Sequence, residues 1–301
     1  VDIDWERKQS VGKADEYVKN VQRLLVEVAD KQKQYFSPNN KNKKKLQAEI
    51  RNLKIELLIN QLSYNKLAYI EKTPQKGGFM PTAFDIKHNT ERELRIAGFD
   101  NLISKLKNLL KNPDEPFNHF DWKLDFPEVL NPYLVNGKGG FDIVIGNPPY
   151  IRVQMLKHEY IDLLKSIFTF AFKRLDISLL FFEKGLSLLK KTGHLCYISS
   201  NQFMFTEYGE KARIGISSKN LKKLLDFADS QVFENALTYT GIFLIQNNDN
   251  GNTFYSKIST IEDLVRPTYN EIDFSSYGKS FWKVGSSKNL DILRKIEQNS
   301  H

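Results

Sequence analysis

The hydrophobic period of this chain changes at about residue 140, and the change limits the folds open to it. Before that point apolar residues recur at helical spacing, whereas Phe141 to Gly146 is a short β-branched run that ends in glycine, as is typical of a buried strand. Helical and strand patterns then alternate as far as Ile258. This alternation predicts the α/β class, with an open and mainly parallel sheet covered on both faces.

The same patterns place the individual elements of this part of the chain. We expect strands over 141–146, 194–199, 224–227 and 239–246, an edge pairing over 253–258, and helices over 177–191 and 207–217. Thr192 and Gly193 are expected to cap the first of these helices. Reactive loops in such sheets follow the carboxyl ends of the strands.

The front of the chain is predicted to be helical. Two stretches with helical apolar spacing, 18–28 and 46–67, flank the break Ser37-Pro38-Asn39-Asn40. Because proline cannot continue a helix and Asn and Ser favour turns, an antiparallel helical hairpin is expected. A third helical stretch covers 94–110 and ends before Pro113.

Positive charge is concentrated in this helical part. Residues 1–80 contain 16 Lys and Arg against 10 Asp and Glu, so +6 of the net charge of +8 lies there. A basic balance is typical of proteins that meet nucleic acid. The run Lys41 to Lys45 could contact phosphate or could be a solvated helix face, and the sequence leaves both interpretations open.

Three regions are expected along the chain. Residues 1–116 are expected to form a helical region. The composition changes at residue 117, where aromatic residues and prolines are concentrated. Residues 117–260 hold the alternating pattern. Residues 261–301 show little periodicity and are expected to be a linker leading out.

Composition narrows the class and compartment. The longest apolar runs, such as Leu179 to Phe182, are far shorter than the roughly 20 residues that span a bilayer. A single cysteine, Cys196, and no charged-then-apolar leader predict a reducing cytoplasm. Five scattered histidines give no zinc-ligand spacing, so no metal is expected. The chain begins with Val1, and we expect it to be part of a longer one.

The tetrapeptide Asn147-Pro148-Pro149-Tyr150 stands at the expected carboxyl end of the first strand. An amino group on a planar ring is a poor nucleophile, because its lone pair is delocalised into the ring. An asparagine oxygen and a backbone carbonyl can each accept one of its N–H groups and so favour a tetrahedral nitrogen. Two prolines stiffen the loop and leave its carbonyls free. The simplest alternative is a plain turn between a strand and a helix.

Together with the preceding Phe141-Asp142-Ile143-Val144-Ile145-Gly146, the tetrapeptide resembles the catalytic motif of N6-adenine DNA methyltransferases. The resemblance extends over about residues 117–260 and is strongest to large Type IIG enzymes, which join methylation to restriction. It implies part of a Rossmann-like, S-adenosylmethionine-dependent methyltransferase sheet that follows a helical insertion. The implied reaction is methyl transfer to the amino group of an adenine flipped out of double-stranded DNA.

Roles for single residues follow from this resemblance. Asn147 is expected to polarise the amino group and to lie against the cofactor, and Pro148 to offer its carbonyl on a loop stiffened by Pro149. Tyr150 is the expected stacking platform for the flipped base. Phe233 is expected to support that base from its other side, with an ordinary core position as the alternative.

The sequence departs from this family in its cofactor motifs. These enzymes hold S-adenosylmethionine mainly by a glycine-rich loop after a first strand, yet Gly77-Gly78 and Gly139-Gly140 lack the strand-loop-helix setting. We therefore expect the main cofactor loop to lie outside this chain. Any nuclease, and the DNA-recognition domain to which residues 261–301 would lead, are expected outside it too.

Two other functions stay open on the sequence. The same tetrapeptide serves methyltransferases that act on the glutamine amide of a protein or on guanine in RNA. The chain could also be an inactive truncated fragment that binds only DNA or a companion chain. In that case Phe141 to Gly146 becomes an edge strand with apolar faces, which is an aggregation hazard.

Overall fold

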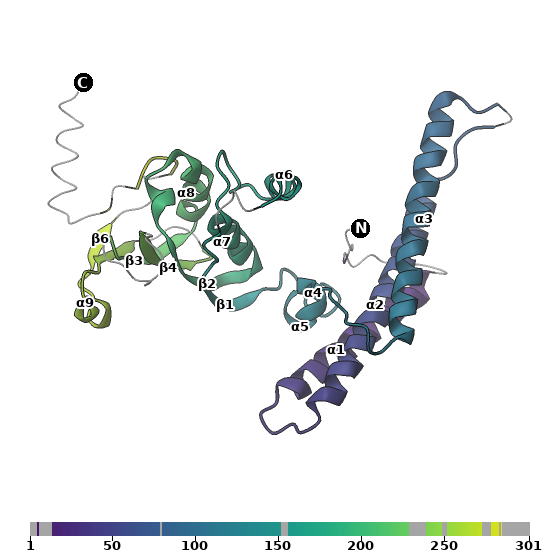
Figure 1. Ribbon diagram of the computed structural model, residues 1–301, viewed down its shortest axis with the longest axis horizontal. Helices are drawn as coiled ribbons and strands as arrows, with labels where there is room; N and C mark the ends of the chain where they lie inside the picture. Colours follow the sequence, from purple (N-terminus) through teal and green to yellow (C-terminus); the bar gives the residue numbers. More distant parts are fainter. Residues whose placement is uncertain are drawn as a thin grey trace. The chain divides into compact units, whose positions relative to one another are not determined.

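The computed structural model describes residues 5, 14–78, 80–151, 156–228, 239–248, 252–272, 278–282 and 284. The chain forms two compact units, Val1–Gly139 and Gly140–His301, which are shown in Figure 1 and are described separately. None of the helices within these described ranges is both long enough and apolar enough to cross a membrane.

The first unit is helical, as predicted. Its helices are α1 (Ala14–Phe36), α2 (Lys43–Lys72), α3 (Ala83–Lys111), α4 (Trp122–Asp125) and α5 (Pro127–Leu130). The predicted hairpin is α1 with α2, and α3 returns along α2 (Figure 1). Thr82 caps α3 in a reciprocal pair with Asp85, which satisfies backbone N–H groups that the first turn leaves free.

One face of α1 supplies the core of this unit. Val21, Leu24, Leu25 and Val28 are each at most 1% exposed, and they pack with residues of α2 that include Leu57. Burying one such side chain contributes about 1.5 to 3 kcal/mol. The helical spacing seen in the sequence therefore encodes the main contact of the hairpin.

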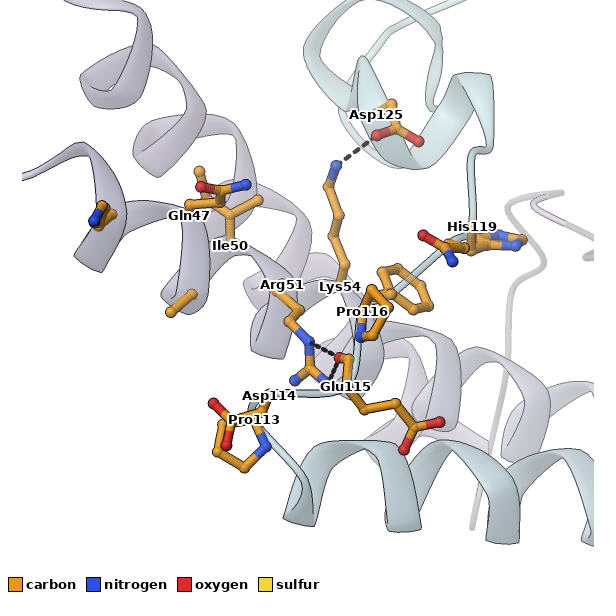
Figure 2. A pocket seen from close by; sticks show the side chains of 14 residues that line it. Gln47, Ile50, Arg51, Lys54, Pro113, Asp114, Glu115, Pro116, His119 and Asp125 are labelled. Atoms are coloured by element: carbon orange, nitrogen blue, oxygen red, sulfur yellow. Dashed lines mark hydrogen bonds and ion pairs between the residues drawn. The ribbon is translucent and has the colours of Figure 1, made fainter.

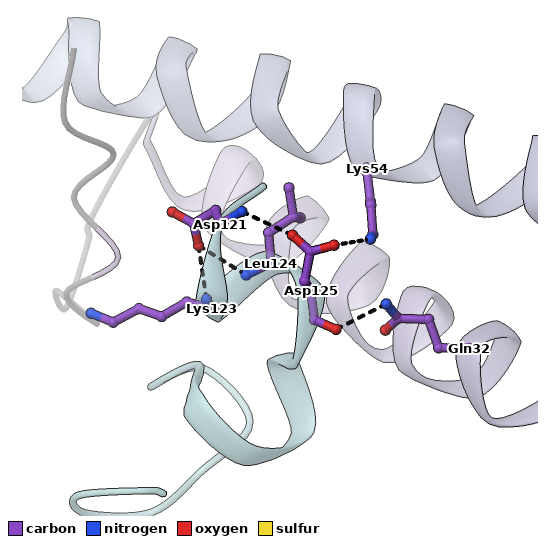
Figure 3. Close-up of polar contacts among 6 residues, drawn as sticks. All are labelled: Gln32, Lys54, Asp121, Lys123, Leu124 and Asp125. Carbon is purple, nitrogen blue, oxygen red and sulfur yellow. Dashed lines mark hydrogen bonds and ion pairs between the residues drawn. The ribbon is translucent and has the colours of Figure 1, made fainter. Parts of the chain in front are cut away.

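Polar contacts tie α4 to the hairpin (Figure 3). Asp121 caps α4 by accepting two of its backbone N–H groups. Lys54 Nζ lies 2.5 Å from Asp125 Oδ1, and the Gln32 side chain donates to the Asp125 carbonyl at 3.0 Å. Residues 117–139, which the sequence places with the second region, thus pack in the first unit.

The second unit is a mixed α/β unit, so the predicted α/β class is confirmed. Its strands are β1 (Phe141–Gly146), β2 (Leu189–Ser200), β3 (Asn220–Asp226), β4 (Thr240–Gln246), β5 (Thr253–Lys257) and β6 (Asn270–Ile272). Its α-helices are α6 (His158–Ile167), α7 (Ile177–Leu188), α8 (Glu210–Ser217) and α9 (Ile261–Val265), with short 3-10 turns η2 (Gln202–Met204) and η3 (Glu207–Gly209).

The strand order is β1-β2-β4-β3-β5-β6. The pairs β1/β2 and β3/β5 are parallel, whereas β2/β4, β3/β4 and β5/β6 are antiparallel. The prediction of a mainly parallel sheet was therefore wrong, because β4 inserts in the reverse direction between β2 and β3. An apolar strand pattern is the same whichever way its neighbours run, so the sequence carries little information on strand direction.

The prediction that β1 is buried was also wrong. β1 pairs with β2 on one side only and stands at the edge of the described sheet. Ile143 and Ile145, on one face of the strand, are 65% and 78% exposed. The apolar run correctly predicts a strand, but it does not predict whether the strand is buried. Burial depends on which other elements pack against it.

Three local predictions also differ from the structure. The first predicted helix ends at Leu188 instead of 191, and β2 begins at once. The expected edge strand β5 lies between β3 and β6. The described part of residues 261–301 is not a simple linker, because α9 and β6 form there and Trp282 is fully buried in the core of this unit.

Candidate functional site

Several loops of the second unit meet at one end of its sheet. β1 runs parallel to β2, so the loop after Gly146 lies at the end where β2 finishes at Ser200. β4 starts at that end, with Thr240 opposite Ser200, and β3 finishes there with Asp226 opposite Gly241. The topology thus brings residue 147, residue 201 and residue 226 to one rim, as the rule for carboxyl ends of strands anticipates.

The Asn-Pro-Pro-Tyr loop follows β1 directly, as predicted. Its four residues have different environments: Asn147 is exposed, Pro148 buried, Pro149 half-buried and Tyr150 36% exposed. The Asn147 amide makes no hydrogen bond with any described residue. Its oxygen is therefore available to accept a hydrogen bond from a ligand, on a loop whose middle is anchored in the protein.

Tyr150 is held by a contact across the rim. Its hydroxyl is hydrogen-bonded to the side chain of Thr240 at the start of β4. Burial raises the pKa of the Tyr150 phenol above its usual value, and the carboxylate of Asp176 adds to this, since both disfavour the anion. The ring therefore stays neutral at physiological pH and is fixed at one end.

A buried polar network lies beside this contact. Asn201 Nδ2 donates to Asp226 Oδ1 at 2.7 Å, and the Tyr255 hydroxyl donates to Asp226 Oδ2 at 3.2 Å. The backbone N–H of Ala228 also donates to Asp226, at 3.0 Å. These donors offset the cost of placing a carboxylate where it is 6% exposed.

The network forms part of the wall of a hollow of about 500 Å³. Residues that line it come from the loops after β2 and β3 and from the start of β4: Asn201, Gln202, Phe205, Thr206, Asp226, Ala228 and Tyr239. The Asn201 Oδ1 atom is buried without a hydrogen-bond partner among the described residues. An acceptor that is buried at the wall of a hollow without a partner is costly unless a ligand or water pairs with it.

One buried arginine fixes the loop beneath this hollow. Arg213 is 2% exposed and donates to the carbonyls of Phe203, Thr206 and Lys279 at 2.5 to 3.1 Å. It thereby joins the loop after β2 to the C-terminal segment that carries Trp282. From the sequence alone, Asn201 and Asp226 were assigned no role. Polar residues directly after buried strands were the available signal for them.

Not every predicted site residue can be placed. Phe233 lies outside the described residues. Among those that are described, no group of three or more His, Cys, Asp or Glu side chains is placed to hold a metal ion.

S-adenosylmethionine, the cofactor that the family resemblance implies, is only partly matched by these residues. The described segment before β1 is a set of helices and turns, and it contains no strand followed by a glycine loop and a helix. Asn147 is the one expected cofactor contact that the structure places at the rim. The expectation that the main cofactor-binding loop lies outside this chain stays a prediction.

Comparison with known proteins identifies the family. The family of Eco57I restriction-modification methylases matches residues 29–233, and this chain belongs to it. The match includes the Asn-Pro-Pro-Tyr loop, β2 and β3, and it begins within α1. The resemblance to restriction-modification methyltransferases is thus confirmed.

Two relatives show how much of such a protein is present. The Type II restriction enzyme and methyltransferase RM.Eco57I of Escherichia coli is 35% identical over 178 residues, which are 55% of this chain and 17% of that protein. The Type II methyltransferase M.BstVI of Geobacillus stearothermophilus is 31% identical over 153 residues, or 50% of this chain and 24% of that protein. The chain therefore spans less than a third of these two curated relatives.

Two solved structures are similar at lower identity. A nuclease-deletion mutant of the Type ISP restriction-modification enzyme LlaGI, in complex with a DNA substrate mimic, is 10% identical, with 78% of this chain and 28% of that chain covered and a TM-score of 0.40. The DrdV–DNA complex is 13% identical, with 53% and 21% covered and a TM-score of 0.39.

Proposed function

We propose that this chain is the catalytic part of a DNA methyltransferase that methylates the N6 amino group of adenine within a restriction-modification enzyme. The observation that carries the proposal is the Asn-Pro-Pro-Tyr loop at the carboxyl end of β1, with the Asn147 amide open to a ligand. Family membership supports the general class of methyltransferase. Adenine as the target and the Type IIG arrangement are part of the proposal.

In the proposed reaction, S-adenosylmethionine supplies the methyl group when it is bound. Asn147 Oδ1 and the carbonyl of Pro148 each accept one N–H of the adenine amino group. These two acceptors favour the tetrahedral form of the nitrogen, whose lone pair is then free to react. The acceptors act most strongly when the nitrogen gains positive charge, so they lower the barrier more than they strengthen ground-state binding.

The other rim residues position the base. Tyr150 offers its ring as the stacking surface for an adenine flipped from double-stranded DNA, and its bond to Thr240 keeps the ring in one place. Pro149 restricts the loop between the two functional residues. The hollow next to Tyr239 gives room on the same rim for a flat heterocycle.

The open face of β1 bears on where the cofactor is held. Ile143 and Ile145 are exposed on a strand that has an unpaired edge in the described sheet. Such a surface favours further strands or helices packing on it. We propose that the main cofactor-binding elements cover this face, and that this chain by itself binds S-adenosylmethionine weakly or not at all.

The experiment that tests the proposed function is methyl transfer to duplex DNA by the protein that carries this chain. Nucleosides from the digested product are identified by mass spectrometry, which separates N6-methyladenine from methylated cytosine. We expect N6-methyladenine, and we expect Asn147→Ala to lower the rate by about 100- to 1,000-fold, the usual effect of removing one such polar group.

Controls separate chemistry from docking. Asn108→Ala, on the exposed side of α3, should leave the rate unchanged, and Asn147→Ala should keep duplex affinity within about twofold. Methylation of protein glutamine or RNA guanine in place of DNA adenine, or an unchanged rate in Asn147→Ala, would contradict the proposal. Tight binding of S-adenosylmethionine to the isolated chain in calorimetry would contradict the placement of the cofactor loop.

A further inference from the structure

The turn between α1 and α2 carries an unusual concentration of lysine. Residues 31–48 contain six lysines and no Asp or Glu. Five of them are exposed, and they lie at the end of α1, in the turn and in the first turn of α2. Figure 1 shows the hairpin of α1 and α2 that carries them. We call these five the lysine tip: Lys33, Lys41, Lys43, Lys44 and Lys45.

The charges of the lysine tip are not balanced by neighbours. Lys33, Lys41 and Lys44 form no ion pair within the described part of the chain. Lys45 lies 3.9 Å from Glu49, but that carboxylate has its closer partner in Lys31, at 2.6 Å. Three other lysines of the same unit are paired at 2.5 to 2.7 Å: Lys19 with Asp15, Lys54 with Asp125, and Lys66 with Asp100.

Helix stability does not explain this arrangement. The first turns of α1 and α3 contain acidic residues, as the positive end of a helix dipole favours, whereas that of α2 contains none and begins with three lysines. Cations at this end repel the dipole and one another. The three lysines of the tip in the first turn of α2 therefore oppose the folding of that helix.

The start of α2, with its three lysines, lies beyond the end of α3. The last turn of α3 is bound by Arg51, whose guanidinium donates to the carbonyls of Leu109 and Asn112. Lys43 lies eight residues before Arg51 on α2. At about 1.5 Å per residue this places Lys43 roughly 12 Å along the helix axis from Arg51. A hollow of about 550 Å³ lies beside α2 here, and Lys44 of the tip is one of its lining residues; Arg51 and Lys54, which also line it, are already engaged (Figure 2).

We propose that the lysine tip binds the phosphate backbone of double-stranded DNA, as a surface on the helical unit and not on the unit that carries the Asn-Pro-Pro-Tyr rim; this inference rests on the proposed function. Lysine is a flexible point charge that suits phosphate and does not read bases. An anionic membrane is a poorer match, because the apolar face of α1 that would enter it is buried in the hairpin. The tip thus supplies affinity and not sequence choice.

The test compares two variants with the same change of charge. The tip variant is Lys41→Gln, Lys43→Gln, Lys44→Gln and Lys45→Gln. The control is Lys87→Gln, Lys105→Gln, Lys107→Gln and Lys111→Gln, all exposed on α3. Binding of two fluorescent 30-base-pair duplexes of unrelated sequence is measured by anisotropy at several salt concentrations.

Each lost phosphate contact lowers the slope of log affinity against log salt by about 0.9. We expect the slope of the tip variant to fall by about 2 to 4 on both duplexes and its affinity by on the order of 10- to 100-fold. The control should stay within about twofold of the wild type. The melting temperature of the tip variant should be unchanged or higher, since a repulsive cluster has been removed.

Equal slopes in the two variants would overturn the inference, as would a loss confined to one duplex. If the tip variant loses binding to anionic phosphatidylserine vesicles but keeps its binding to the duplexes, the inference is overturned in favour of a membrane as the partner. The proposed function is judged separately by the methylated nucleoside. If the tip variant binds like the control while N6-methyladenine still forms, only the inference about the tip is rejected. If binding depends on the tip but no methylated adenine forms, only the proposed function is rejected.

Discussion

In the helical unit the apolar face of α1 is buried against α2, whereas in the sheet unit the apolar face of β1 is open and polar groups at the rim have no hydrogen-bond partner among the described residues. Its unsatisfied groups include the open face of Ile143 and Ile145, the free amide of Asn147 and the unpaired Asn201 Oδ1. These groups lie at β1 or at the rim where β1 and β2 end. The comparison teaches that the open face of β1 and the unpartnered polar groups of the rim coincide with the candidate site.

Each unit contains an arginine that donates to backbone carbonyls, but the two arginines differ in burial. Replacing the more deeply buried one is expected to have the largest effect on stability. Arg213 and Arg51 each donate to three backbone carbonyls, but Arg213 is 2% exposed and Arg51 is half-buried. We expect Arg213→Met to lower the free energy of unfolding by about 3 kcal/mol or more, because buried carbonyls lose a charged donor. Arg51→Met should cost about 1 kcal/mol, since water can replace the guanidinium.

Urea unfolding followed by circular dichroism measures both variants. Equal losses of free energy would break the comparison, because they would mean that burial does not decide the cost. A loss in Arg213→Met together with unchanged thermal stability of the helical unit would sharpen it, by showing that the units unfold separately.

Tyr255 gives a second way to examine the sheet unit, through pH. Burial and the Asp226 carboxylate raise the pKa of the Tyr255 phenol far above its usual value of about 10. Above pH 10 the unfolded chain ionises this phenol first and so holds fewer protons than the folded chain. Stability must therefore fall as pH rises through this range, by up to about 1.4 kcal/mol per pH unit.

Tyr255→Phe removes this dependence. We expect the variant to lose about 1 to 2 kcal/mol of unfolding free energy at pH 7, because Asp226 loses a donor. Its stability should then fall less steeply than that of the wild type between pH 9 and pH 11. Parallel curves for the two proteins in urea titrations across this range would show that Tyr255 does not ionise on unfolding.

The smallest effect on stability is expected at the open face of β1. Ile145→Lys should change the unfolding free energy by only about 0.5 kcal/mol, because the side chain is 78% exposed. It should nevertheless reduce concentration-dependent self-association, since a charge on an edge strand opposes strand addition. Leu94→Lys, at a position 68% exposed on α3, is the matched control and should leave self-association unchanged.

Sedimentation velocity at increasing protein concentration distinguishes these outcomes. Identical behaviour of the two lysine variants would mean that the β1 face is not special among exposed apolar positions. The contrast between the helical and the sheet unit would then rest on the polar groups of the rim alone.

The sequence alone determined the helical hairpin, the α/β class and the position of the Asn-Pro-Pro-Tyr loop at the end of β1. These are local matters: apolar spacing, proline and glycine breaks, and a short motif after a β-branched run. Only the tertiary structure decided the antiparallel place of β4, the exposure of β1, the burial of Trp282 and the network of Asn201, Asp226 and Tyr255. The direction of a strand and the elements that pack on it depend on residues far apart in the chain. The pairing of a buried carboxylate does too, because its hydrogen-bond donors become its neighbours only after folding.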